Sequence, residues 1–158
     1  MKKIFLVLFI ITIFIAETML LVNCEKKHQG IYGIVVERYG NWMPPIDPND
    51  SSLGERPIIR KVCVYEYTTI FDLDSATQHD CYTYFPIDKM PKPLVASAIS
   101  NEKGFYEIPL EPGKYSVFLL EDGKMYANEG DGYGGFCPVT VNAGSKSEMN
   151  LVLDHAVY

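Results

Sequence analysis

Histidine and cysteine are the side chains of this 158-residue sequence that could most directly carry chemistry. The histidines are His28, His79 and His155, and no two of them have the His-x-x-x-His spacing that places two metal ligands on one face of a helix. His79 lies in a polar triplet with Asp80 and Cys81 that is typical of a solvated turn. Spacing alone therefore predicts no catalytic, cofactor-binding or metal-binding residue.

Common enzyme signatures are also absent, since the sequence contains neither Gly-x-Ser-x-Gly nor His-Glu-x-x-His. We therefore expect a non-catalytic protein. The alternative is a hydrolase or a metal-dependent enzyme whose site is assembled from carboxylates and a sequence-distant histidine, His79 or His155. A histidine that lies beside a pocket, within reach of a carboxylate or a second histidine, would favour that alternative.

Acidic residues in the loops offer the oxygen ligands that Ca²⁺ prefers, although their spacing does not follow an EF-hand loop. Aspartate is also an ordinary turn residue, so the sequence predicts no metal site but leaves calcium open. The acidic candidates are Asp47, Asp50, Asp72, Asp74, Glu129 and Asp131.

The first 23 residues differ from the rest of the chain. Lys2 and Lys3 give a positive start, and residues 4–16 are apolar apart from Thr12. A basic start before a short apolar core is the pattern of a secretory signal peptide. The core is well short of the about 20 residues that a membrane-spanning helix needs. Residues 1–23 therefore predict export.

Residues 21–24, Leu-Val-Asn-Cys, resemble a bacterial lipobox, in which the cysteine is acylated and becomes the new N-terminus. Asn23 departs from the pattern, where a smaller residue is usual. The resemblance implies lipidation of Cys24 and a place in the cell envelope, on the periplasmic or surface side of a membrane. Two alternatives stay open: cleavage after Ala16, and an uncleaved anchor that would bury Glu17 in lipid at about 2–4 kcal/mol.

Three cysteines remain if Cys24 carries a lipid, and an oxidising compartment favours one disulfide and one thiol. Cys81 lies in a long loop that a disulfide would restrain, whereas a strand cysteine such as Cys63 packs as a small hydrophobe. We predict a disulfide between Cys81 and Cys137, with Cys63 buried and reduced. The rival pairing of Cys63 with Cys81 stays open.

The rest of the chain predicts a short polar tether, residues 24–29, and one all-β domain, residues 30–158. Short runs rich in β-branched and aromatic residues alternate with turns that contain Pro and Gly, as in a sandwich or barrel. The predicted strands are residues 31–37, 58–67, 94–99, 105–110, 115–121, 139–141 and 149–153. Alternation predicts burial of Ile108, Tyr115, Val117 and Leu119. In 58–67 it does not decide whether Val62 and Val64 or Cys63 and Tyr65 face inward.

Residues 101–108, Asn-Glu-Lys-Gly-Phe-Tyr-Glu-Ile, and 110–117, Leu-Glu-Pro-Gly-Lys-Tyr-Ser-Val, resemble the central hairpin of the carboxypeptidase regulatory-like domain. Gly33-Ile34-Val35 is similar to the first strand of that family. The resemblance implies a seven-stranded transthyretin-like β-sandwich and an accessory or binding role. The segments 39–57 and 68–93 depart from the family as long insertions.

The charge of the chain bears on its partners. The net charge is −6 and the basic residues are scattered, so we expect no nucleic-acid partner. The lipid implies a membrane as one partner, and an envelope protein or a glycan remains open as the ligand of the domain.

Overall fold

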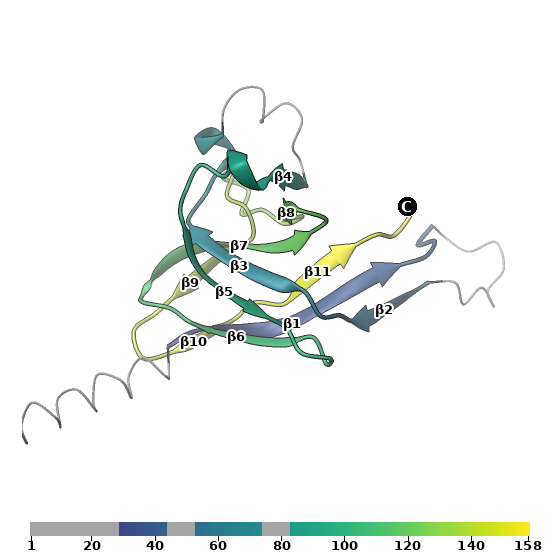
Figure 1. The fold of residues 1–158 in the computed structure, drawn as a ribbon, viewed down its shortest axis with the longest axis horizontal. Helices are drawn as coiled ribbons and strands as arrows, with labels where there is room; N and C mark the ends of the chain where they lie inside the picture. The colour runs from purple at the N-terminus through teal and green to yellow at the C-terminus, as the bar shows by residue number, and fades with distance from the viewer. Residues whose placement is uncertain (1–28, 44–52, 74–82) are drawn as a thin grey trace, which may run out of the picture.

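The computed structural model describes residues 29–43, 53–73 and 83–158, which form two β-sheets (Figure 1). Two short 3₁₀ helices, η1 and η2, lie between strands, and no α-helix occurs in these residues. The strands are β1 (Gly30–Tyr39), β2 (Gly54–Pro57), β3 (Lys61–Glu66), β4 (Tyr84–Pro86), β5 (Leu94–Ile99), β6 (Phe105–Pro109), β7 (Gly113–Glu121), β8 (Lys124–Tyr126), β9 (Pro138–Val141), β10 (Lys146–Glu148) and β11 (Leu151–Asp154). The helices are η1 (Ile70–Asp72) and η2 (Ile87–Lys89).

The first sheet is built around β1, which has partners along both edges. β10 and β11 follow one another along one edge, both parallel to β1, while β6 and β2 pair antiparallel with the other edge. Asn150 lies between β10 and β11, and its side-chain Oδ1 accepts a hydrogen bond from the backbone N–H of Ile34 in β1. The last strand, β11, thus lies alongside the first strand, β1, as Figure 1 shows.

The second sheet is built around β7. β3 pairs with one edge of β7 and carries β5 on its far side, while β8 and β9 pair with the other edge and β4 pairs with β8. The β7–β8 turn consists of Asp122 and Gly123, both with positive φ (46° and 75°). Positive φ at both central residues is the signature of a type I′ hairpin, whose twist suits the flanking strands.

Two apolar clusters stabilise the sheets. The first lies between them and contains Ile31 and Val35 of β1 together with Val117 of β7. The second lies on the outer face of the second sheet and contains Cys63 of β3 and Phe118 of β7. Segments near η1, β4 and the 127–137 loop cover that outer face, because Leu73, Phe85, Ala127 and Cys137 belong to the same cluster. The two central strands of the second sheet, β3 and β7, are therefore buried on both faces.

The sequence did not decide which of the two alternating sets of side chains in β3 faces inward. Both sets are buried, each in a different apolar cluster. Val62 and Val64 face the inter-sheet cluster, and Cys63 and Tyr65 face the outer one.

The predicted central hairpin is wrong, because β6 pairs with β1 in the first sheet and β7 pairs with β3 in the second, so the chain crosses between the sheets at residues 110–112. Three of the four residues predicted to be buried in these two segments, Ile108, Val117 and Leu119, are at most 2% exposed, which confirms them. Tyr115 is only partly buried.

All seven predicted segments contain strands, and the all-β class is confirmed. The predicted count of seven is too low, because β2, β4, β8 and β10 are also present in the described residues. These strands have three or four residues each. Such short segments show too little alternation to stand out in a sequence.

Several predicted features lie outside the described residues. These are the signal segment with Cys24, His28, and part of each long insertion, including His79, Cys81, Asp47, Asp50 and Asp74. In the part of the chain that is described, no helix is long and apolar enough to cross a membrane.

Candidate functional site

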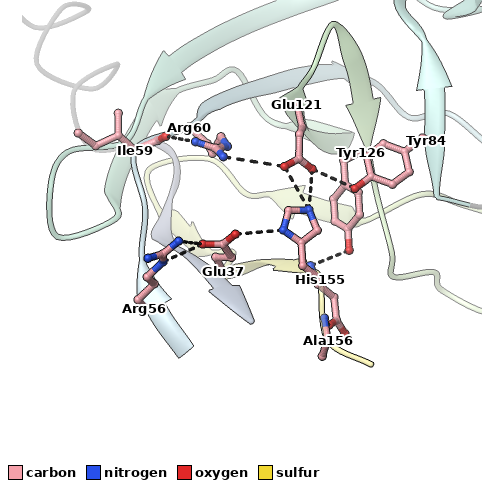
Figure 2. A network of polar contacts seen from close by, with 10 residues as sticks. Glu37, Arg56, Ile59, Arg60, Tyr84, Glu121, Tyr126, His155 and Ala156 are labelled. Atoms are coloured by element: carbon pink, nitrogen blue, oxygen red, sulfur yellow. Dashed lines mark hydrogen bonds and ion pairs between the residues drawn. The ribbon is translucent and has the colours of Figure 1, made fainter. Parts of the chain in front are cut away.

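His155 lies between two carboxylates that come from different sheets (Figure 2). Its Nδ1 is 3.0 Å from Oε1 of Glu37, on β1. Its Nε2 is 3.2 Å from Oε1 and 3.3 Å from Oε2 of Glu121, the last residue of β7. Both ring nitrogens are therefore engaged, which favours the doubly protonated imidazolium.

Each carboxylate has further partners besides His155. Arg56, on β2, places Nε and Nη2 2.8 and 2.7 Å from Oε2 of Glu37. Tyr84, on β4, donates its hydroxyl to Oε2 of Glu121 over 3.0 Å, and Nη2 of Arg60 lies 3.9 Å from Oε1. We call Glu37, His155 and Glu121 the carboxylate–histidine bridge.

Strand pairing explains how residues so far apart in sequence meet. In the parallel pair of β1 and β11, Arg38 is opposite Asp154, so both strands end at the same point. The backbone N–H of His155 donates to the carbonyl of Arg38 over 2.9 Å, which extends this pairing by one residue. Tyr126 fixes the same corner from β8, because its hydroxyl accepts the backbone N–H of Asp154.

The electrostatics of the bridge agree with its geometry. Hydrogen bonds from Arg56 and then His155 lower the pKa of Glu37. Burial alone would lower the pKa of His155, but the hydrogen bond to Glu37 and the charge of Glu121 outweigh it and raise this pKa above its ordinary value. Burial and the hydrogen bond to Glu121 raise the pKa of Tyr84, so its hydroxyl stays protonated. Each carboxylate of the bridge thus faces His155 and one arginine, Arg56 or Arg60.

A cavity of about 340 Å³ opens beside the bridge, lined by Tyr84, Glu121, Asp122, Lys124 and His155. A histidine within reach of carboxylates beside a cavity is the observation that favours an enzyme. However, a general base needs a free ring nitrogen, and here both nitrogens already face carboxylates. The arrangement therefore suits a structural clamp between the sheets better than proton transfer.

The described residues contain no group of three or more His, Cys, Asp or Glu side chains placed to hold a metal ion. Two of the acidic calcium candidates are engaged elsewhere. Asp72 accepts from the backbone and hydroxyl of Thr69 and pairs with Lys92 at 3.1 Å. Asp131 accepts from Tyr67 and Lys114.

The structure describes two of the three cysteines in the disulfide prediction, Cys63 and Cys137. Cys63 and Cys137 are both buried in the outer cluster, and no disulfide joins them to one another. Burial raises the pKa of both thiols. Cys81 lies outside the described residues, so its pairing with Cys137 stays a prediction.

Sequence reasoning named His155 as a candidate but missed Glu37 and Glu121. A signal for all three was present, because each stands at or just past the end of an apolar run that forms a strand. A titratable residue at a strand end faces the rim of the sheet, where two layers meet solvent. The same pattern also fits Glu66 at the end of β3 and Asp154 at the end of β11, so it narrows the candidates without singling out the bridge.

Comparisons of the chain with protein-family models, with curated proteins and with solved structures give no match in any of the three. The resemblance of residues 101–108 and 110–117 to the carboxypeptidase regulatory-like domain therefore remains a prediction.

Proposed function

We propose that the chain is a non-catalytic binding module held in the bacterial cell envelope by a lipid on Cys24. The observation that carries the non-catalytic part is the engagement of both ring nitrogens of His155 by Glu37 and Glu121. The basic start, the apolar core of residues 4–16 and the lipobox-like residues 21–24 support the anchor.

Labelling with palmitate tests the anchor. The full chain, expressed in a bacterium, should incorporate labelled palmitate and partition with membranes, and Cys24→Ala should abolish both. Cys81→Ala is the matched control and should keep both, because it removes a cysteine outside the lipobox-like motif. A soluble, unlabelled protein whose N-terminus is Glu17 would contradict the proposal.

An enzyme remains the second candidate, because His155 lines a cavity and lies within hydrogen-bond distance of two carboxylates. A panel of p-nitrophenyl esters, phosphates and glycosides separates the two candidates. We expect no turnover above background. Turnover that falls by about 100-fold or more in His155→Gln would favour the enzyme, since that is the usual contribution of a general acid or base.

The carboxypeptidase regulatory-like, transthyretin-like assignment belongs to the same proposal. Its support is the sequence of residues 101–108 and 110–117, and in the turn before β6 Oδ1 of Asn101 accepts the backbone N–H groups of Lys103 and Phe105. At the next turn, the hydroxyl of Tyr115 donates to the carbonyl of Glu111. An experimentally determined structure with the strand order of that family would support the assignment, and a different order would contradict it.

A further inference from the structure

We propose that β5 pairs edge to edge with β5 of a second copy of this chain, so that the second sheets of the two copies become one continuous sheet. This inference depends neither on the lipid anchor nor on the binding role proposed above. β5 is an edge strand, because it pairs with β3 and with no other strand of the described residues (Figure 1).

The composition of β5 separates it from the other edge strands of the two sheets. Its six residues, Leu-Val-Ala-Ser-Ala-Ile, include no charge and no proline. The other described edge strands are β2, β4, β6, β9, β10 and β11, and each of them contains a proline or a charged residue. Charges and prolines on edge strands hinder pairing with another chain. Among the described strands, β5 is therefore the edge that lacks this protection.

The backbone of β5 presents donors and acceptors along its free side. In the antiparallel pair of β3 and β5, the N–H of Ser100 donates to the carbonyl of Arg60 over 3.0 Å. Hydrogen-bonded and non-hydrogen-bonded pairs alternate along such a ladder, so the backbone groups of Ser97 and Ile99 point away from β3. A row of outward N–H and C=O groups fits another β-strand, which pairs with it as an added strand.

A two-fold axis at Ser97 gives two copies of β5 a register in which these groups pair. The two Ser97 residues then exchange both backbone hydrogen bonds, and Ile99 of each copy lies opposite Val95 of the other. Val95 and Ile99 are 44% and 69% exposed, so this pairing shields two large apolar side chains of each copy from water. One strand thus supplies both halves of the contact, as a two-fold dimer requires.

A cavity at one end of β5 also fits this register. It has a volume of about 250 Å³, and its mainly apolar lining includes Val95 and Ala96 of β5, Leu110, and Tyr115 of β7. Because Ile99 of one copy lies opposite Val95 of the other, the most exposed apolar side chain of the strand lies beside this cavity. The two-fold axis makes the contact twice.

The charges at the two ends of β5 favour the same register. Lys92 precedes the strand, and Glu102 follows it in the turn before β6. In the antiparallel pair, Lys92 of one copy lies level with Glu102 of the other, and Lys103 lies level with Pro91, so opposite charges meet and like charges do not. A register shifted by two residues in either direction loses both attractive pairs. Lys92 also contacts Asp72 of its own chain at 3.1 Å, so these charges select the register rather than supply most of the affinity.

Cysteine cross-linking of the full chain, purified in a mild detergent, tests the inference. In a Cys81→Ala background, Ser97→Cys should form a covalent dimer under copper-phenanthroline oxidation, because a hydrogen-bonded pair has Cα atoms about 5.5 Å apart. Ile99→Cys alone should not, since its two copies would lie about 13 Å apart along the strands. Val95→Cys combined with Ile99→Cys should link the copies. Glu107→Cys, on the edge strand β6, is the matched control and should stay monomeric.

Sedimentation of the same protein measures the affinity. A pair of six-residue strands is a small interface, so we expect a Kd of about 10–100 µM and a monomer at the low micromolar concentrations of folding experiments. Ile99→Lys should raise the Kd by about tenfold or more, because it places a charge opposite Val95 in both halves of the contact. Ile34→Lys, at a position 44% exposed in β1 of the first sheet, is the matched control and should leave the Kd unchanged.

Three results would overturn the inference. They are a protein that stays monomeric at about 1 mM, well above the expected Kd, Ile99→Cys that cross-links to itself as readily as Ser97→Cys, and a dimer that Ile34→Lys breaks but Ile99→Lys does not. The last result would place the contact on the face of the first sheet. The substituted side chains are exposed, so the variants should fold, and their thermal transitions check this.

Discussion

Nε2 of His155 lies 3.2 Å from Oε1 of Glu121, so a residue that follows β11 of the first sheet contacts the last residue of β7 in the second sheet. Through Nδ1 the same ring contacts Glu37 of β1. Charged contacts therefore join the two sheets at one end, beyond the inter-sheet apolar cluster. A positive imidazolium between two carboxylates makes the strength of this joint depend on pH.

The first prediction is that His155→Gln destabilises the protein most between about pH 5 and pH 6. Because the pKa of His155 is raised in the fold, its stabilising effect is fully present below the ordinary value of 6.5 and is lost as pH rises through the folded value. Because the pKa of Glu37 is lowered, its effect is lost only as pH falls below 4.5. The side chain of His155 is 38% exposed, so solvent limits the effect to about 1 kcal/mol or less.

Chemical denaturation of the wild type and the variant at a series of pH values measures this difference. We expect the difference in unfolding free energy to shrink towards about pH 8, and to shrink with added salt. Lys146→Gln is a matched control, because its ion pair with Glu107 contains no histidine and should show no such trend near neutral pH. A pH-independent loss in His155→Gln would contradict a charged bridge.

The second prediction concerns β7, whose neighbouring residues Val117 and Phe118 are both 0% exposed but face different clusters. Val117→Ala should cost about 2–3 kcal/mol and Phe118→Ala about 3–5 kcal/mol, because each leaves a cavity in a packed core. Denaturant midpoints measure both. Ile99→Ala, at a position 69% exposed, should change stability by less than about 0.5 kcal/mol. An unchanged midpoint for either β7 variant would show that its face is not buried.

The third prediction is that Gly33→Ala destabilises the protein by more than about 2 kcal/mol. An added Cβ at Gly33 would lie 2.0 Å from the carbonyl oxygen of Met149. Met149 has little freedom to move, since its N–H donates to the carbonyl of Tyr32 and its carbonyl accepts the hydroxyl of Tyr106.

Gly130→Ala is the matched control for Gly33→Ala. Its new Cβ would lie 3.3 Å from the nearest atom, the carbonyl oxygen of Gly135. Its thermal midpoint should fall much less. Equal losses in the two variants would mean that β1 does not approach the β10–β11 junction as closely as the structure shows.

Sequence patterns predicted several strands well, because alternation in a segment such as residues 105–109, whose side chains are exposed and buried in turn, reports burial directly. They missed β2, whose four residues include Glu55, Arg56 and Pro57 and whose pairing depends on the open edge of β1. β8 could have been predicted, because Asp-Gly at 122–123 is a strong hairpin signal. The candidate site was harder to predict, because His155 and Glu37 are 118 residues apart in the sequence. The parallel pairing of β1 with β11 brings them together, and the sequence does not show which strands pair.

The last prediction concerns the thiols, because Cys63 and Cys137 lie in the same outer cluster at 1% and 3% exposure. Burial raises the pKa of Cys63, so little thiolate forms and alkylation of the native protein should be slow until it unfolds. Peptide mapping of the exported protein without reduction should show Cys81 linked to Cys137, and Cys63→Ala should leave that link intact. In the chain-entropy model this bond would contribute about 3–4.5 kcal/mol, which a reductant should remove. A peptide that links Cys63 to another cysteine, or three free thiols in the oxidised protein, would contradict the pairing.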